Sequence, residues 1–251
     1  ILSRAKLIRY NHLNLEHLEK LIKGNLIKRK IIVTDGVFSM DGDIADIPGL
    51  VYLCEKYDAT LYVDDAHGYG VLGSSGQGIL EYYEDQGLIS NQSKNFIIYM
   101  FTLGKSIGVS GAMLCAKKEV IEYCIQKSKP YIYTTAAPPY IASGAITSMN
   151  IIKNDIRLRK KLNSLIELFR LKIFNKSTLT SSKTAIQPIV INDLKKAISI
   201  SSQLLKLGFL VPVIRPPTVP AGTSRLRVSI SALHTKKDII SLASTINALL
   251  I

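Results

Sequence analysis

Over residues 1–154, short apolar runs alternate with apolar positions at helical spacing. The apolar runs, which predict strands, are residues 31–33, 60–63, 96–101 and 112–116. Because the runs are nearly continuous rather than alternating, we expect strands buried on both faces. Residues 15–22 and 50–54 instead carry apolar side chains three or four positions apart, which is typical of amphipathic helices. This order predicts an α/β domain whose mainly parallel sheet has helices on both faces.

The pattern changes near Asp155. A long basic amphipathic helix is expected over residues 155–174, and a Ser/Thr-rich break follows it at residues 177–182. The later elements are a strand at 186–191, a helix ending near Gly208, strands at 210–214 and 226–230, and a last helix that Thr235 and Asp238 open at capping-box spacing. We therefore predict a large domain over residues 1–154 and a smaller C-terminal α+β domain over residues 155–251.

Composition narrows the class of protein. Of the 251 residues, 47% are hydrophobic and 20% are charged, as is usual for a soluble globular protein, and no apolar run reaches the length of a membrane span. The formal net charge of +13 is spread along the chain, which favours a lysine-rich solvated surface over nucleic-acid binding. The three cysteines form no CxxC pair, so no zinc site is expected. Cys54 and Cys115 are predicted to be buried thiols in a reducing, cytoplasmic compartment.

The most informative segment ends the second apolar run. Two acids and a histidine, Asp64, Asp65 and His67, follow that strand. In open α/β sheets ligands bind beyond the carboxyl ends of strands, and a carboxylate buried there needs a positive partner. A protonated pyridine nitrogen would be such a partner for Asp64, with His67 near the same ring. A helix-capping carboxylate with a structural histidine explains the segment alone equally well, and a divalent metal site is a third interpretation.

A lysine follows the third apolar run among small residues. Lys105 is flanked by Gly104 and Ser106 just after the run at 96–101. A lysine at a strand end loses solvent, which lowers its pKa and makes its amine a nucleophile. Thr102 offers a hydroxyl suited to a phosphate oxygen. A surface lysine is the alternative interpretation, because most of the 32 basic residues must be exposed.

Two nucleotide-binding patterns are incomplete. Gly104-Lys105-Ser106 resembles the end of a phosphate-binding loop, but the motif needs a glycine where Tyr99 stands. Residues 68–73 match GxGxxG, yet residues 74–78 are a poor helix opening and no acid-ended strand follows at the required distance. A dinucleotide site is therefore not expected.

Two further loops carry polar side chains. Residues 34–43 are small and polar after a strand, so Ser39 is a candidate hydroxyl donor, although a plain turn explains the segment too. Residues 214–227 combine a Pro/Gly-rich loop with a strand in which Arg225 and Arg227 face the same way. A guanidinium there suits a carboxylate, and a solvated edge strand is an equally good interpretation.

Together these segments resemble the α-oxoamine synthase family, within the fold-type I enzymes that depend on pyridoxal 5′-phosphate (PLP). The resemblance rests on TDGVFSMDGDIA (34–45), VDDAHGYGVLG (63–73), TLGKSIGVSGA (102–112), IYTTAAPP (132–139) and IRPPTVPAGTSRLR (214–227). It implies a catalytic set in which Lys105 carries PLP as a Schiff base, Asp64 pairs with the pyridine nitrogen and His67 contacts the ring. It further implies cofactor contacts by Ser39, by Thr102 and, across a homodimer, by Thr134 or Thr135, with substrate contacts by Thr218 and by Arg227, or less favourably Arg225.

Within the family, the match implies decarboxylating condensation of L-alanine with a pimeloyl thioester of CoA or a carrier protein, giving 8-amino-7-oxononanoate for biotin biosynthesis. Sister acyltransferases that use glycine, of the 2-amino-3-ketobutyrate ligase or 5-aminolevulinate synthase type, and a non-catalytic dimerising fragment are the alternatives. No metal, nucleic acid or membrane partner is implied. Family chains begin well upstream of Ile1, so a glycine-rich phosphate loop and a ring-stacking histidine are expected to be missing. Residues 1–251 alone are then expected to be inactive and poorly stable.

Overall fold

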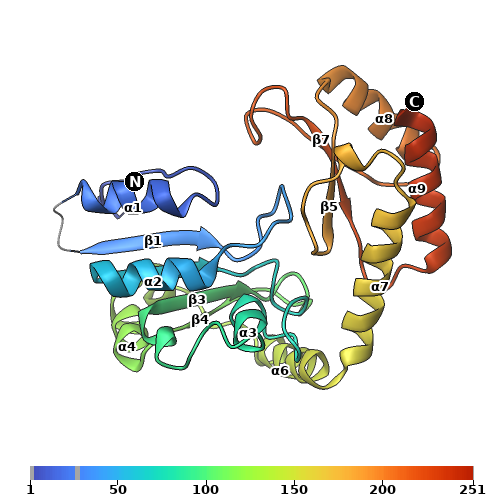
Figure 1. Cartoon of the computed structure of the whole chain (residues 1–251). Helices are drawn as coiled ribbons and strands as arrows, with labels where there is room; N and C mark the ends of the chain where they lie inside the picture. The colour runs from blue at the N-terminus through green and yellow to red at the C-terminus, as the bar shows by residue number, and fades with distance from the viewer. Residues whose placement is uncertain (1–2, 26–28, 251) are drawn as a thin grey trace.

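The apolar strands of the first half form one four-stranded sheet (Figure 1). The computed structural model describes residues 3–25 and 29–250, so the opening at Ile1 lies outside the described residues. The strands are β1 (Lys30–Asp35), β2 (Ala59–Asp64), β3 (Ile97–Thr102) and β4 (Ala112–Cys115), in that spatial order. The first three are parallel and β4 is antiparallel to β3. The carboxyl ends of β1, β2 and β3 therefore share one edge of the sheet.

One α-helix separates each pair of consecutive parallel strands along the chain, and other helices precede or follow the strands of the sheet. These helices are α1 (Leu15–Lys23), α2 (Ile47–Tyr57), α3 (Ile79–Glu84), α4 (Lys118–Lys127), α5 (Lys129–Ile132) and α6 (Pro139–Asn154). Local capping fixes two of them. The side chain of Asn14 accepts a hydrogen bond from the His17 N–H at the start of α1, and Asp46 accepts one from the Gly49 N–H at the start of α2. The α/β class with a mainly parallel sheet is confirmed.

The helices cover the two faces of the sheet unequally. The face that carries Ile32, Leu61 and Phe101 is buried in a core shared with residues of α1, α2, α3 and α6. On the opposite face of β1, Ile31 and Val33 are 67% and 60% exposed. Burial along β1 therefore alternates, and no residue of β4 is buried, so our expectation of strands buried on both faces is wrong for these two strands; β2 and β3 alternate between buried and half-buried positions. The apolar character of β1 alone did not distinguish a strand buried on both faces from one buried on a single face.

Residues beyond Asp155 build a second core around a small antiparallel sheet, beside which α7, α8 and α9 lie in Figure 1. The elements are α7 (Ile156–Lys172), β5 (Ile186–Val190), α8 (Leu194–Lys206), β6 (Val213–Ile214), β7 (Arg225–Ser229) and α9 (Lys236–Leu250), with strand order β5-β7-β6. The expected capping box is present, because Asp238 Oδ2 accepts from the Thr235 N–H at 2.7 Å and Thr235 Oγ1 accepts from the Asp238 N–H at 3.2 Å.

Three expectations need correction. The strand expected over residues 96–101 begins one residue later, because the short 3-10 helix Ser93–Phe96 precedes it. The strand expected over residues 210–214 shrinks to Val213–Ile214, since Pro212 has no N–H to donate to a ladder. Cys115 is exposed rather than buried, because β4 is an edge strand. In the described ranges, no helix is long and apolar enough to span a bilayer.

The second core offers a direct stability test. Phe169 is 0% exposed in α7, whereas Leu171 on the same helix is 72% exposed. Phe169→Ala should lower the free energy of unfolding by ~3–5 kcal/mol, because it removes a buried ring and leaves a cavity. Leu171→Ala should change it by less than about 0.5 kcal/mol. Urea unfolding of both variants measures the difference, and equal effects would contradict this account of the core.

Candidate active site

Polar side chains gather where the three parallel strands end. Asp35, Asp64 and Thr102 are the last residues of β1, β2 and β3, and the register places Asp35 beside Asp64. Just beyond them, Lys105 Nζ lies 3.1 Å from His67 Nε2. The structure thus brings together at one edge residues that the sequence separates by up to seventy positions.

The surroundings of Lys105 and His67 favour their neutral forms. Partial burial lowers the pKa of Lys105, the charge of Arg227 lowers it further, and Asp64 and Asp35 oppose the change. Burial, followed by the charges of Lys105 and Arg227, lowers the pKa of His67 to about 4. Lys105 is exposed, and so are its neighbours Gly104 and Ser106, whereas its place after an apolar strand led us to expect a desolvated lysine. Its amine is therefore accessible and less basic than that of an ordinary lysine.

Asp64 and its neighbour Asp65 have opposite environments. Asp64 is partly exposed, and in the part of the chain that the structure describes its carboxylate accepts only the Ala66 N–H, at 3.0 Å. Asp65 is 0% exposed and accepts the Tyr99 hydroxyl at 2.6 Å. Burial raises the pKa of Asp65 to about 7. Asp64 is therefore the more accessible of the two carboxylates, and its pairing with a ligand stays a prediction.

The two arginines of β7 also differ. Arg225 is 5% exposed and forms an ion pair with Asp41. Arg227 donates from Nε to the Ser39 carbonyl oxygen at 2.7 Å, and its charge reaches both Lys105 and His67. Arg227 is the guanidinium near the lysine, which agrees with the choice made from the sequence. Arg225 is occupied in holding β7 to the loop that contains Asp41.

The remaining candidate residues differ in burial and in hydrogen bonding. Thr102 Oγ1 is buried and has no hydrogen-bond partner in the described residues. Ser39 is partly exposed in the loop beside Arg227. Thr134 and Thr135 lie in an exposed segment after α5, and Thr218 lies in an exposed turn closed by the Arg215 carbonyl. In the described part of the chain, no hydrogen bond joins Thr134, Thr135 or Thr218 to Lys105.

Sequence reasoning missed two groups: Asp35, whose charge reaches Lys105, and His12, whose charge reaches Asp35. Asp35 has a raised pKa, chiefly because it is desolvated and secondly because it lies near Asp64. His12 lies 2.7 Å from Asp43, with its ring edge-on to Phe38 at 4.3 Å. His12, Asp41 and Asp43 also bring one possible metal-ligand atom each within 4.8 Å of one another, whereas Asp64 and His67 belong to no such group in the described ranges. Asp35 becomes a neighbour of Asp64 only through the pairing register of β1 and β2, which the sequence alone did not give.

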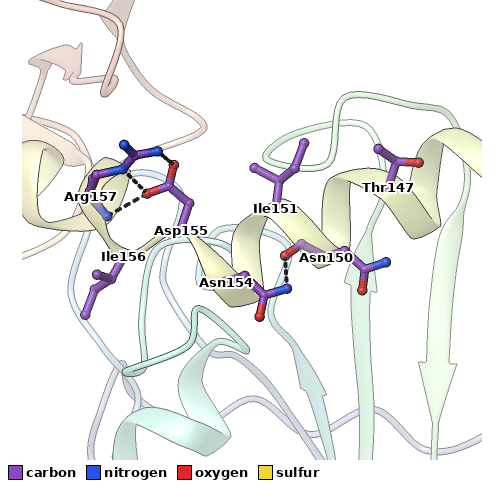
Figure 2. A pocket seen from close by; sticks show the side chains of 7 residues that line it. All are labelled: Thr147, Asn150, Ile151, Asn154, Asp155, Ile156 and Arg157. Carbon is purple, nitrogen blue, oxygen red and sulfur yellow. Dashed lines mark hydrogen bonds and ion pairs between the residues drawn. The ribbon is translucent and has the colours of Figure 1, made fainter.

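A separate hollow of about 670 Å³ lies where α6 meets α7 (Figure 2). Its lining residues are Thr147, Asn150, Ile151, Asn154, Asp155, Ile156 and Arg157. Asp155 and Arg157 are bonded to each other there, and no residue of the Lys105 cluster lines it. We therefore place the candidate site at the sheet edge rather than in this hollow.

The chain belongs to the aminotransferase class I and II family, whose model matches residues 1–246. It is 47% identical over 250 residues to the 8-amino-7-oxononanoate synthase of Methylobacillus flagellatus and 43% identical over 250 residues to that of Nitrosomonas europaea. Each alignment covers 99% of this chain, but the chain spans only 61% and 64% of those two proteins.

Solved structures agree with this assignment. A serine palmitoyltransferase from S. paucimobilis, with bound PLP–myriocin aldimine, has a TM-score of 0.86 at 30% identity, covering 98% of this chain and 61% of that one. An 8-amino-7-oxononanoate synthase from Francisella tularensis has a TM-score of 0.84 at 32% identity, covering 99% of this chain and 70% of that one. The fold-type I architecture expected from the sequence is confirmed.

The lowered pKa of His67 predicts an acid-sensitive contribution to stability. The unfolded chain takes up a proton near pH 6.5 and the folded chain only near 4, so stability is full above about pH 6.5 and falls as the pH drops toward 4. The half-exposed ring is screened, so we expect about 1 kcal/mol rather than the full ~3 kcal/mol. In His67→Gln, unfolding free energies measured from pH 7 to 4 should decline less steeply by that amount. His234→Gln, in the second core's last loop, is the control, and an equal flattening there would contradict the assignment.

Proposed function

We propose that this chain, within a protein extended upstream to the length of its relatives, binds PLP on Lys105 and condenses L-alanine with a pimeloyl thioester, of CoA or a carrier protein, to give 8-amino-7-oxononanoate in biotin biosynthesis. The observation that carries the proposal is Lys105, accessible and with a lowered pKa, 3.1 Å from His67 and under the charge of Asp64. Such a lysine beyond a strand end suits a covalent amine. The relatives named above support the choice of acyl transfer to an amino acid.

The side chains present fit PLP. The buried, unpartnered Thr102 hydroxyl suits a phosphate oxygen, and the carboxylate of Asp64 has room for a protonated ring nitrogen. Lys105 would hold the cofactor, His67 and Ser39 would contact its ring substituents, and Thr134 or Thr135 would reach a phosphate across a homodimer. When bound, PLP supplies an electron sink that labilises bonds at the amino acid's α-carbon.

The protein's residues then have separable tasks. The carboxylate of Asp64 stabilises positive charge next to it, and the neutral ring of His67 forms hydrogen bonds without adding charge. The Lys105 amine, once free, takes the α-proton, which its lowered pKa favours. Arg227 binds the amino acid's carboxylate, and Thr218 is a further substrate contact. Overall, the α-carbon bonds to the acyl carbon while the thiol and carbon dioxide leave.

The broader organisation follows from the same proposal. We infer that the two cores are two domains, residues 1–154 and 155–251, and that the protein works as a cytoplasmic homodimer on small-molecule substrates. The two hydrophobic cores share no buried residue, which supports two domains. Arg227, from the second of them, is close enough for its charge to lower the pKa of Lys105.

Borohydride reduction tests the cofactor assignment. Reduction of the PLP-reconstituted protein, followed by peptide mapping, should place the pyridoxyl group on Lys105. Lys105→Ala should abolish the label, whereas Lys94→Ala, a lysine paired with Glu84 away from the site, should leave it unchanged. A label on any other lysine would overturn the assignment.

A substrate panel tests the reaction. Alanine, glycine and serine would each be combined with pimeloyl-, acetyl-, succinyl- and palmitoyl-CoA, and thiol release would be followed. Serine and the long acyl chain belong in the panel because serine palmitoyltransferase is as similar in fold as the oxononanoate enzyme. Alanine with the pimeloyl thioester should be turned over at least about tenfold faster than the other pairs. Faster turnover of glycine would assign the chain to a sister acyltransferase.

A further inference from the structure

Asp65 is a buried carboxylate that the proposed reaction does not use. It follows Asp64 directly, and successive side chains of a strand end point to opposite sides, so Asp64 faces the site while Asp65 faces the core. Asp65 is 0% exposed. A charge buried without a cation destabilises a fold, so its presence calls for a compensating role.

Asp65 joins three segments of the chain. Its Oδ2 accepts the Tyr99 hydroxyl of β3 at 2.6 Å and the Ile79 N–H at the start of α3 at 2.8 Å. Its backbone N–H donates to the Met100 carbonyl at 2.7 Å, and its carbonyl accepts the Gly68 N–H at 3.2 Å. The turn that contains His67 is therefore closed directly onto Asp65.

Three glycines surround the carboxylate so closely that no side chain would fit in their place. A Cβ on Gly36 would lie 2.4 Å from Asp65 Oδ1, one on Gly68 would lie 2.0 Å from the same atom, and one on Gly78 would lie 2.0 Å from Oδ2. These glycines follow β1, follow β2 and precede α3. The loops after β1 and β2 are thus packed against the same carboxylate.

Most of the other side-chain anchors hold the far end of the loop at residues 68–78. Glu81 accepts the Gln77 N–H at 2.8 Å, Asp85 accepts the Ser74 N–H at 2.8 Å, and Arg159 of α7 donates to the Ser74 carbonyl at 2.8 Å. All three act at residues 74–77. At the end nearest His67, the loop is fixed by Asp65 and by Ser106, whose Oγ donates to the Tyr69 carbonyl oxygen at 2.7 Å.

We propose that Asp65 is a positioning residue: by tying the turn after β2 to β3 and α3, it fixes Asp64 and His67 around Lys105. This inference rests on the proposed function for its catalytic meaning, but the geometry it asserts exists without a cofactor. No cationic side chain of the described residues contacts the carboxylate; the titratable groups that face it are Tyr99 and, more distantly, Asp64.

The first measurement needs no cofactor. The pH dependence of Lys105 acetylation by acetic anhydride, quantified by peptide mapping, gives the apparent pKa of that amine in wild type and variants. Asp65→Ala should move it back toward the ordinary lysine value, because a loosened turn reduces the packing that partly desolvates the Lys105 amine. Asp65→Asn keeps an oxygen for Tyr99 and Ile79, so it should stay near wild type, and Tyr99→Phe should lie between.

The second measurement is PLP binding, by absorbance titration. Asp65→Ala should weaken it by about 10- to 100-fold, the usual effect of removing a residue that orients a ligand's direct contacts. The matched control is Asn247→Ala in the second core, which removes a side chain 8% exposed that likewise accepts a backbone N–H, that of Phe174 at 3.0 Å. It should lower the melting temperature without changing either readout.

The outcomes separate the two proposals. If wild type fails to bind PLP even when it is extended upstream to the length of its relatives, the proposed function is wrong, while the acetylation profile still decides the role of Asp65. If Asp65→Ala is folded and keeps the wild-type acetylation profile, as Asn247→Ala should, then Asp65 is structural only and the inference is overturned.

Discussion

The candidate site depends on the parallel register of β1, β2 and β3. Parallel strands end at the same edge, so Asp35, Asp64 and Thr102 become neighbours although long connections separate them. Each of these side chains is polar at the point where an apolar strand leaves the core. A one-residue slip of β2 would place Asp64 toward the core and Asp65 toward the ligand, because side chains alternate between faces. The chemistry at this edge is therefore tied to the packing of the apolar residues behind it.

The loop at residues 36–45 joins the first sheet to the second core and so brings a residue of the second core to the site. Residues 36–45 leave β1 and reach the second sheet, where the hydroxyls of Ser182 and Thr184 lie 2.9 and 3.0 Å from the Gly42 carbonyl oxygen. Gly42 has φ +70°, and a Cβ there would lie 2.3 Å from the Ile186 carbonyl oxygen, so only glycine fits this contact. The Asp41–Arg225 ion pair lies beside it. Arg227, two residues along the same strand, is thereby held near Lys105.

The sequence predicted the main elements and four residues that the structure places at one edge of the sheet, because apolar periodicity and the local motifs are short-range signals; their roles stay predictions. It predicted Lys105, His67, Asp64 and Arg227 as members of one site, and the structure brings these four together. It did not predict Asp35, because a single acid at a strand end has no local signature and becomes a neighbour of Asp64 only through strand register. The exposure of Cys115 was missed for a similar reason, since edge position is a property of the sheet and not of the strand.

The adjacent acids Asp64 and Asp65 illustrate why residue type alone does not assign a role. Both are carboxylates at the end of one strand, yet burial raises the pKa of Asp65 to about 7 while Asp64 remains open to a ligand. A carboxylate meant to pair with a cation must keep its charge, so it belongs on the accessible side. A carboxylate meant to gather backbone N–H and hydroxyl donors gains from a dry setting, where each hydrogen bond is stronger. Because side chains alternate along a strand, Asp64 lies on the accessible side and Asp65 on the dry side. The three glycines around Asp65 leave space for its carboxylate.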